Sequence, residues 1–161
     1  MSFYPASTAT NSCTPTMSSL SKETLIVRGG SLPTESLVKK IGSLVGGNIE
    51  ISAQALLESS AWATIRSIIF EGDTAWKKCC VTTPHLAEEQ GLMVLFTPSE
   101  ADPYHCDVRC RSQITDANAD TLEGIAHQFQ AAFRGPFLQN EVNHEWTTDN
   151  IRGLQRPFSA H

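Results

Sequence analysis

The chain of 161 residues is long enough to bury the core of one domain, and its 40% apolar and 18% charged residues are typical of a globular protein. Its formal net charge of −5, with no run of Lys and Arg, argues against nucleic acid and anionic membranes as partners. No stretch approaches the roughly 18 apolar residues of a membrane-spanning helix, and five cysteines without a secretion signal predict reduced thiols and a cytoplasmic location.

The composition predicts three parts along the chain. Residues 1–21 are rich in Ser and Thr and poor in bulky apolar residues, which predicts a disordered tail. Residues 22–136 carry the periodic apolar patterns and are interpreted as a single α+β domain. Residues 137–161 are polar with scattered apolar residues and are interpreted as a C-terminal extension. Trp146 in this extension is a candidate for contact with a protein partner, and packing of the extension on its own domain explains the same residues.

The first predicted elements are a strand and a helix. The apolar run at residues 23–28 predicts the strand. The helix is expected to begin near Ser31 or Thr34, and to end at Gly46 and Gly47.

The next segment allows two interpretations. The favoured one is a short strand at residues 48–52, a brief helix at 53–62, and a hairpin whose strands are 64–71 and 74–82. These hairpin segments are rich in β-branched and aromatic residues, which favour strands. The alternative is one long helix over residues 53–70, because periodicity alone does not exclude it.

The last predicted elements include the clearest patterns of the chain. Residues 83–91 are interpreted as a loop or single turn, and residues 92–97 as a buried strand. Residues 104–114 alternate between apolar and polar side chains, which predicts a half-buried strand. Apolar residues recur at helical spacing within residues 116–134, which predicts a long helix.

This order of elements predicts an α+β fold in which a curved antiparallel sheet packs on the long helix near the C-terminus. It resembles the helix-grip architecture, in which a curved sheet wraps a long C-terminal helix. That resemblance concerns element order alone, and it implies an apolar ligand pocket between the sheet and the helix.

Several common catalytic and cofactor-binding motifs are missing from the sequence. It has no G-x-x-x-x-G-K-[ST], G-x-G-x-x-G, G-x-S-x-G or H-E-x-x-H. No cofactor is therefore expected. A metal site is not expected either: on a strand, Cys106 and Cys110 would lie about 13 Å apart at about 3.3 Å per residue, too far to share one zinc ion.

One face of the strand at residues 104–114 carries His105, Asp107, Arg109 and Arg111, which we call the polar row. A His beside a carboxylate could act as a general base, and two Arg side chains could hold an anion. A solvated or partner-facing surface explains the same alternation and is the favoured interpretation. Further candidate acid–base groups elsewhere in the chain are Glu71 and His85.

The opposite face of this strand carries small residues, which allows either close packing or an enclosed cavity. The candidate aromatic lining of such a cavity is Trp62, Trp76, Phe96, Tyr104 and Phe129. Ordinary core packing explains these residues as well and is favoured.

Two functions remain as hypotheses. The first is a pocket protein that binds an apolar small molecule, with cofactor-independent cyclase, isomerase or dehydratase activity as a possible chemistry. The second is a non-catalytic interaction subunit that holds a protein partner through the polar row or the C-terminal extension.

Overall fold

The structure is a computed structural model that describes residues 20–71, 75–114 and 117–157, and these form an antiparallel sheet with helices on both faces. The described strands, in the order β5-β6-β3-β2-β4-β7, make a six-stranded sheet. Their bounds in chain order are β2 (Leu25–Gly29), β3 (Glu50–Leu56), β4 (Lys78–Thr82), β5 (Leu92–Phe96), β6 (His105–Cys110) and β7 (Arg134–Leu138). The helices are α1 (Thr34–Gly42), α2 (Ala61–Phe70), α3 (Pro84–Glu89), α4 (Ala119–Ala132) and α5 (Thr148–Arg152), with a 3-10 turn at Gln139–Glu141. The predicted α+β class is confirmed.

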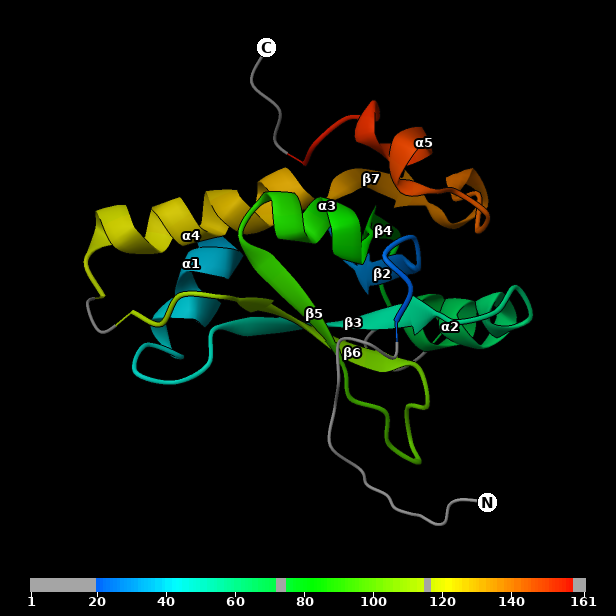
Figure 1. Ribbon diagram of the computed structural model, residues 1–161, viewed down its shortest axis with the longest axis horizontal. Coiled ribbons are helices and arrows are strands. Elements are labelled where there is room, and N and C mark those ends of the chain that lie inside the picture. Colours follow the sequence, from blue (N-terminus) through cyan, green and yellow to red (C-terminus); the bar gives the residue numbers. More distant parts are fainter. Residues whose placement is uncertain (1–19, 72–74, 115–116, 158–161) are drawn as a thin grey trace, which may run out of the picture.

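The core consists of two apolar clusters, one on each face of the sheet. Successive side chains of β2 point to opposite faces of the sheet, so Ile26 packs in the first cluster and Leu25 and Val27 pack in the second. Helices α1 and α4 cover the first face and lie beside each other in Figure 1. Helix α2 and residues of the C-terminal segment cover part of the second face.

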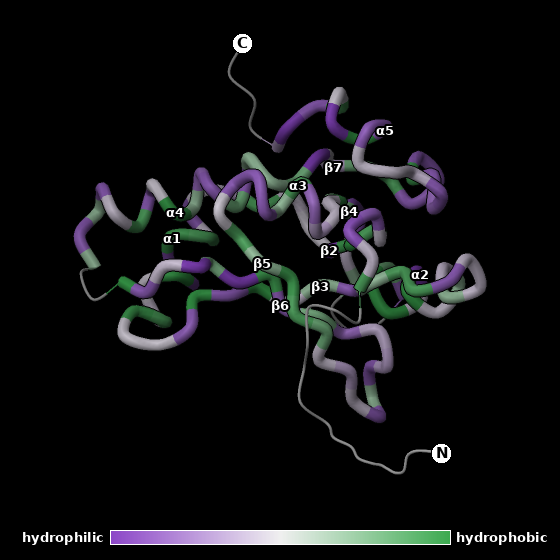
Figure 2. Tube along the Cα trace, viewed as in Figure 1, coloured by the Kyte–Doolittle hydropathy of each residue, from purple (hydrophilic) through white to green (hydrophobic). Residues whose placement is uncertain are grey.

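Helix α4 confirms the long helix predicted within residues 116–134, although it is not the C-terminal element. Asn118 caps its first turn by accepting a hydrogen bond from the Thr121 backbone N–H. Hydrophilic and hydrophobic residues alternate along it in Figure 2, as in an amphipathic helix. Strand β7 and helix α5 follow it, so α4 lies centrally in the element order.

The hairpin predicted over residues 64–71 and 74–82 is wrong in its first half. Residues 61–70 form α2, whose buried residues Ala61, Trp62, Ile65 and Ile69 recur at helical spacing. This spacing outweighs the strand preference of the isoleucines, because a helix places all four against the second cluster.

The helix predicted over residues 53–62 is also wrong, because its first half continues β3 to Leu56. Residues Ala53 and Ala55 point to the first cluster and Leu56 to the second. Burial on both faces therefore overrides the helix preference of alanine. The alternative of a single helix over residues 53–70 fails for the same reason.

Two elements in the last part of the chain were not predicted. Strand β7 contains Gly135 and Pro136, which signal a break rather than a strand. Proline is tolerated there because β7 is an edge strand. Helix α5 follows, and its Ile151 is fully buried in the second cluster, so this part of the predicted extension packs on the sheet.

Residues 1–19 of the predicted disordered tail lie outside the described residues, whereas Leu20 is described and buried in the first cluster. Within the described residues, every helix falls short of the length and apolarity needed to cross a membrane.

Candidate functional site

The alternation predicted for β6 is confirmed. Cys106, Val108 and Cys110 are buried in the first cluster, and His105, Asp107 and Arg109 of the polar row are half-buried on the opposite face. Arg111 follows the end of β6 and is exposed.

The polar row forms hydrogen bonds within the sheet. The Nδ1 atom of His105 lies 2.8 Å from the hydroxyl of Thr97, which donates to Asp107 over 3.2 Å. The Nε2 atom of His105 lies 3.9 Å from Oδ1 of Asp107. Arg109 donates from Nε to Glu50 over 2.8 Å. Burial, and then the charge of Glu50, raise the pKa of the Asp107 carboxyl.

A carboxyl of raised pKa beside a histidine is an arrangement that can move protons. Other predicted acid–base groups lie on different elements: Glu71 follows the end of α2 and is exposed, and His85 lies on α3. The structure therefore groups His105 with Asp107 and does not add Glu71 or His85 to them.

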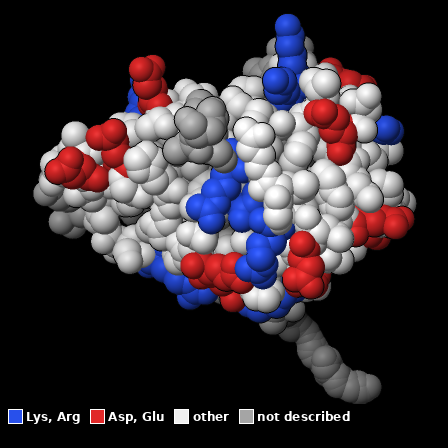
Figure 3. All heavy atoms as spheres, turned by 90° about the horizontal axis from the view of Figure 1, so that it is seen from above, with Lys and Arg blue, Asp and Glu red and all other residues white. Residues whose placement is uncertain are grey.

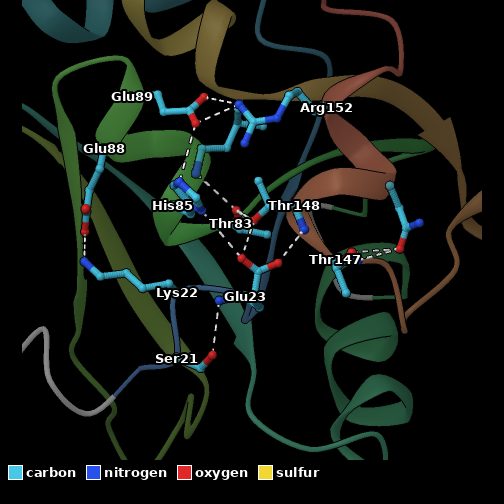
Figure 4. A network of polar contacts seen from close by, with 12 residues as sticks. Ser21, Lys22, Glu23, Thr83, His85, Glu88, Glu89, Thr147, Thr148 and Arg152 are labelled. Atoms are coloured by element: carbon cyan, nitrogen blue, oxygen red, sulfur yellow. Dashed lines mark hydrogen bonds and ion pairs between the residues drawn. The ribbon is translucent and has the colours of Figure 1, made fainter.

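His85 belongs instead to a polar network between the start of β2, α3 and α5 (Figure 4). At its centre, Glu23 accepts from the backbone N–H of Thr148 over 2.7 Å and from its hydroxyl over 3.0 Å. The Thr148 hydroxyl lies 2.7 Å from that of Thr83, and both threonines are buried. The carboxylate of Glu23 thereby holds the first turn of α5 against the start of β2, and the two threonine hydroxyls join that turn to the start of α3.

The outer part of this network is exposed and ionic. The two ring nitrogens of His85 lie 3.6 Å from Glu23 and 3.5 Å from Glu89. Glu89 also accepts from Arg152 of α5 at 2.5 and 2.7 Å. Glu23 also lines a shallow hollow beside the C-terminal segment, whereas His85, Glu89 and Arg152 line none of the described pockets. We interpret the network as a structural link between α3 and α5.

Replacing Glu23 by glutamine is expected to lower the free energy of unfolding by about 1 kcal/mol at pH 7, a modest value because the carboxylate is partly exposed. The Thr148 hydrogen bonds lower the pKa of Glu23 in the folded state. This stabilisation is therefore complete above the ordinary pKa of about 4.5 and is lost as the pH falls through the lowered folded value. Urea unfolding of both proteins from pH 7 to pH 3 measures it. A difference between them that grows toward low pH would contradict the assignment.

The cysteines are placed as buried core residues rather than as ligands. Cys79, Cys80, Cys106 and Cys110 are free and buried, and Cys79 and Cys80 pack in opposite clusters. Burial raises the pKa of both Cys79 and Cys80 to about 12. Among the described residues, no three His, Cys, Asp or Glu side chains come together as a group that could hold a metal ion.

The predicted aromatic lining does not surround one cavity. Phe129 is fully buried in the first cluster, and the partly buried Phe96 packs against that cluster. Trp62 and Tyr104 pack in the second cluster on the other face of the sheet, and Trp62 stacks on His144. Trp76 differs from them, because it is 50% exposed and lines a surface pocket.

This pocket, which we call the Trp76 pocket, has a volume of about 480 Å³ and lies between the end of β2, the first turns of α1 and the start of β4. Its lining residues are Arg28, Gly29, Gly30, Ser31, Leu32, Pro33, Ser36, Leu37, Lys40, Trp76, Lys77 and Lys78. The indole of Trp76 lies against the backbone of Gly29: a Cβ atom at Gly29 would stand 2.1 Å from Cδ1 of the ring.

The pairing of β2 with β4 explains how these residues meet. Gly29 pairs with Cys79 across the sheet, so the segment just before β4 crosses the end of β2. Trp76 lies in that segment and is fixed by its backbone N–H, which donates to the carbonyl of Ile69 over 2.9 Å. Gly30 has a φ of +95°, which lets the chain turn from β2 toward α1.

Sequence reasoning named Trp76 but missed the rest of the pocket. Gly29 and Gly30 directly follow the strand predicted at residues 23–28, and a Gly-Gly pair both ends a strand and permits close approach of a ring to the backbone. The lysines beside Trp76 are an additional signal, because they concentrate positive charge in a chain of net charge −5. Charge is also uneven on the face shown in Figure 3, where Lys and Arg gather near the centre and Asp and Glu lie mostly around them.

Comparisons of this chain with models of protein families, with curated proteins and with solved structures find no match.

Proposed function

We propose that this protein binds a small molecule in the Trp76 pocket. The observation that carries the proposal is the pocket itself, whose volume of about 480 Å³ falls within the range of about 300–1,000 Å³ that is usual for ligand sites. Its walls combine apolar surface from Leu32, Leu37 and Trp76 with a few charged groups, which is the usual composition of such sites.

The setting of Trp76 supports the same proposal. Large aromatic side chains are usually buried, yet half of this indole is exposed beside a hollow. One side of the ring lies close to Gly29 and Gly30, which leaves no room for a side chain at Gly29. A flat ligand can then stack on the indole without a large loss of side-chain entropy.

Cofactor-independent cyclase, isomerase or dehydratase chemistry remains a further prediction. It needs an acid–base group at the ligand, and His105 with Asp107 is the candidate pair, because the Thr97 hydroxyl contacts both side chains. Neither of these residues lines the Trp76 pocket. The helix-grip arrangement also remains a prediction, and it would place a ligand between the sheet and α4 rather than at the end of β2.

The alternative of a non-catalytic interaction subunit has less support. Trp146 of the C-terminal segment packs on Phe137, with ring centroids 5.3 Å apart, and His144 stacks on Trp62. These aromatic side chains therefore contact their own chain.

Replacing Gly29 by alanine tests the proposal. The new methyl group would collide with the Trp76 ring and displace it, so binding of the flat probe 1-naphthol is expected to weaken at least about tenfold. Gly153→Ala is the matched control, because nothing lies within 4 Å of a Cβ atom there. Trp76→Ala should reproduce the loss. Binding would be measured by ligand-detected NMR and titration calorimetry, with circular dichroism to show that each variant is folded.

Absence of 1-naphthol and 1-naphthyl phosphate binding to the natural sequence would overturn the proposed function. So would equal binding by the Gly29→Ala and Gly153→Ala proteins.

A further inference from the structure

Among the described residues, the charged side chains that line the Trp76 pocket are all basic. Four of its lining residues are basic, namely Arg28, Lys40, Lys77 and Lys78, and no acidic residue of the described chain lines it. The protein as a whole has a net charge of −5, so this concentration of positive charge runs against the average of its surface. Basic groups without acidic partners at one hollow create a potential that attracts anions.

Arg28 is the most informative of the four. Its NH1 group donates to the carbonyl of Ser52 over 2.6 Å, whereas its Nε atom is buried and has no hydrogen-bond partner among the described residues. Arg28 also makes no ion pair within the described residues. Burial lowers the pKa of its guanidinium, which reflects the cost of holding this charge away from water. An anion in the adjacent pocket would provide the missing counter-charge.

The pocket wall formed by the segment between β2 and α1 has an unusual backbone conformation. Leu32 has a φ of +54°, which is uncommon for a bulky residue, and its side chain is buried. The buried amide of Gln130 on α4 donates to the carbonyl of Leu32 and to the hydroxyl of Thr34, each over 3.0 Å. These bonds anchor the segment between β2 and α1, so the pocket wall is formed before any ligand arrives.

We propose, resting on the proposed function, that the ligand is a small flat-ring compound that carries a dianionic group, of which a phosphate monoester is the commonest kind. Its ring stacks on Trp76. Its anionic group lies toward Arg28 and is attracted by the ammonium groups of Lys40, Lys77 and Lys78. A dianion suits this set of basic groups better than a carboxylate, which brings one charge.

The test compares three probes that share one ring: 1-naphthyl phosphate, 1-naphthoate and 1-naphthol. We expect calorimetry at low salt to give 1-naphthyl phosphate the tightest binding, at least about tenfold tighter than 1-naphthol, with 1-naphthoate between them. The advantage of the phosphate should shrink as salt is added, because exposed lysines contribute part of it.

Lys40→Gln is the variant of choice, and Lys39→Gln is its matched control. Both lysines are exposed on α1, but only Lys40 lines the pocket, so both variants should fold. Compared with Lys39→Gln, Lys40→Gln is expected to weaken 1-naphthyl phosphate binding about threefold or more, and so to reduce the preference for 1-naphthyl phosphate over 1-naphthol. Arg28→Gln should have a larger effect, but it can also affect folding, and the lysine pair keeps the test decisive.

Each outcome separates the two proposals. Equal affinities for 1-naphthol and 1-naphthyl phosphate overturn the dianion assignment, while the small-molecule function stands if Gly29→Ala still weakens binding relative to Gly153→Ala. The same assignment is overturned if Lys40→Gln and Lys39→Gln behave alike. Binding to vesicles that contain phosphatidic acid, without binding to soluble 1-naphthyl phosphate, would identify a lipid headgroup and overturn a soluble ligand. If neither 1-naphthol nor 1-naphthyl phosphate binds, both proposals fail.

Discussion

Replacing Phe129 by alanine is expected to lower the free energy of unfolding by about 3–5 kcal/mol, the usual cost of truncating a fully buried aromatic residue. Phe129 has 0% exposure and packs on the inner side of α4, in the same cluster as Leu37 and Ile41 of α1. Its removal would leave a cavity where α1, α4 and the sheet meet. Urea unfolding followed by circular dichroism measures the loss. Glu123→Ala is the control, since Glu123 is exposed on the same helix, and its effect should stay within about 0.5 kcal/mol.

The same variant separates the two interpretations of the aromatic residues. If Phe129 is only a core residue, the folded Phe129→Ala protein should bind 1-naphthol with unchanged affinity at the Trp76 pocket. If Phe129 instead lines a ligand cavity, its truncation should cost less than about 1 kcal/mol and alter binding. That second result would restore a site between the sheet and α4.

The elements that could be predicted are those whose pattern is local. Strand β6 alternates through six residues because one face packs on α4 and the other does not. Helix α4 has an apolar stripe within its own sequence, although its capping residue is Asn118 and not the expected Thr115 or Asp116, which lie outside the described residues. In both cases the pattern that decides the structure lies inside the element, so no distant contact was needed to interpret it.

Other elements depend on contacts that the local sequence does not show. Residues 61–70 contain Ile65 and Ile69, which suit a strand as well as a helix, and the second apolar cluster decides between them. Strand β7 contains Gly135 and Pro136 directly after its first residue, Arg134, and it forms because β4 offers a free edge to pair with. Tertiary context therefore overrides local preference in both places.

The candidate site also depends on contacts that the local sequence does not show. Trp76 could be named from its residue type, but its position against Gly29 follows from the register of β2 and β4, which no local pattern gives. The positive charge of the pocket likewise depends on α1 returning beside β2, which brings Lys40 to the same hollow as Arg28. The sequence predicted that the polar row shares one face of a strand. It did not predict the contacts of the Thr97 hydroxyl with His105 and Asp107.

Replacing Arg134 by methionine is expected to lower the free energy of unfolding by about 2–4 kcal/mol. Arg134 is 3% exposed, and its NH1 group donates to the carbonyls of Ala131 and Phe133 at the end of α4, over 2.8 and 3.0 Å. Its Nε atom donates to the carbonyl of Arg152 in α5 over 3.3 Å. Methionine fills similar space without a donor, so these carbonyls would lose their partners in a buried site.

The exposed Arg152 provides the matched control for this prediction. Its guanidinium pairs with Glu89 at the surface, where solvent and salt screen the interaction, so Arg152→Met should change stability much less than Arg134→Met. Hydrogen exchange of the α5 amides should accelerate in Arg134→Met, because the link between α4 and α5 is cut. Equal stability losses in the two variants would show that the buried guanidinium does not join the C-terminal segment to the rest of the fold. That result would favour treating residues 137–161 as an extension that is energetically separate from the sheet.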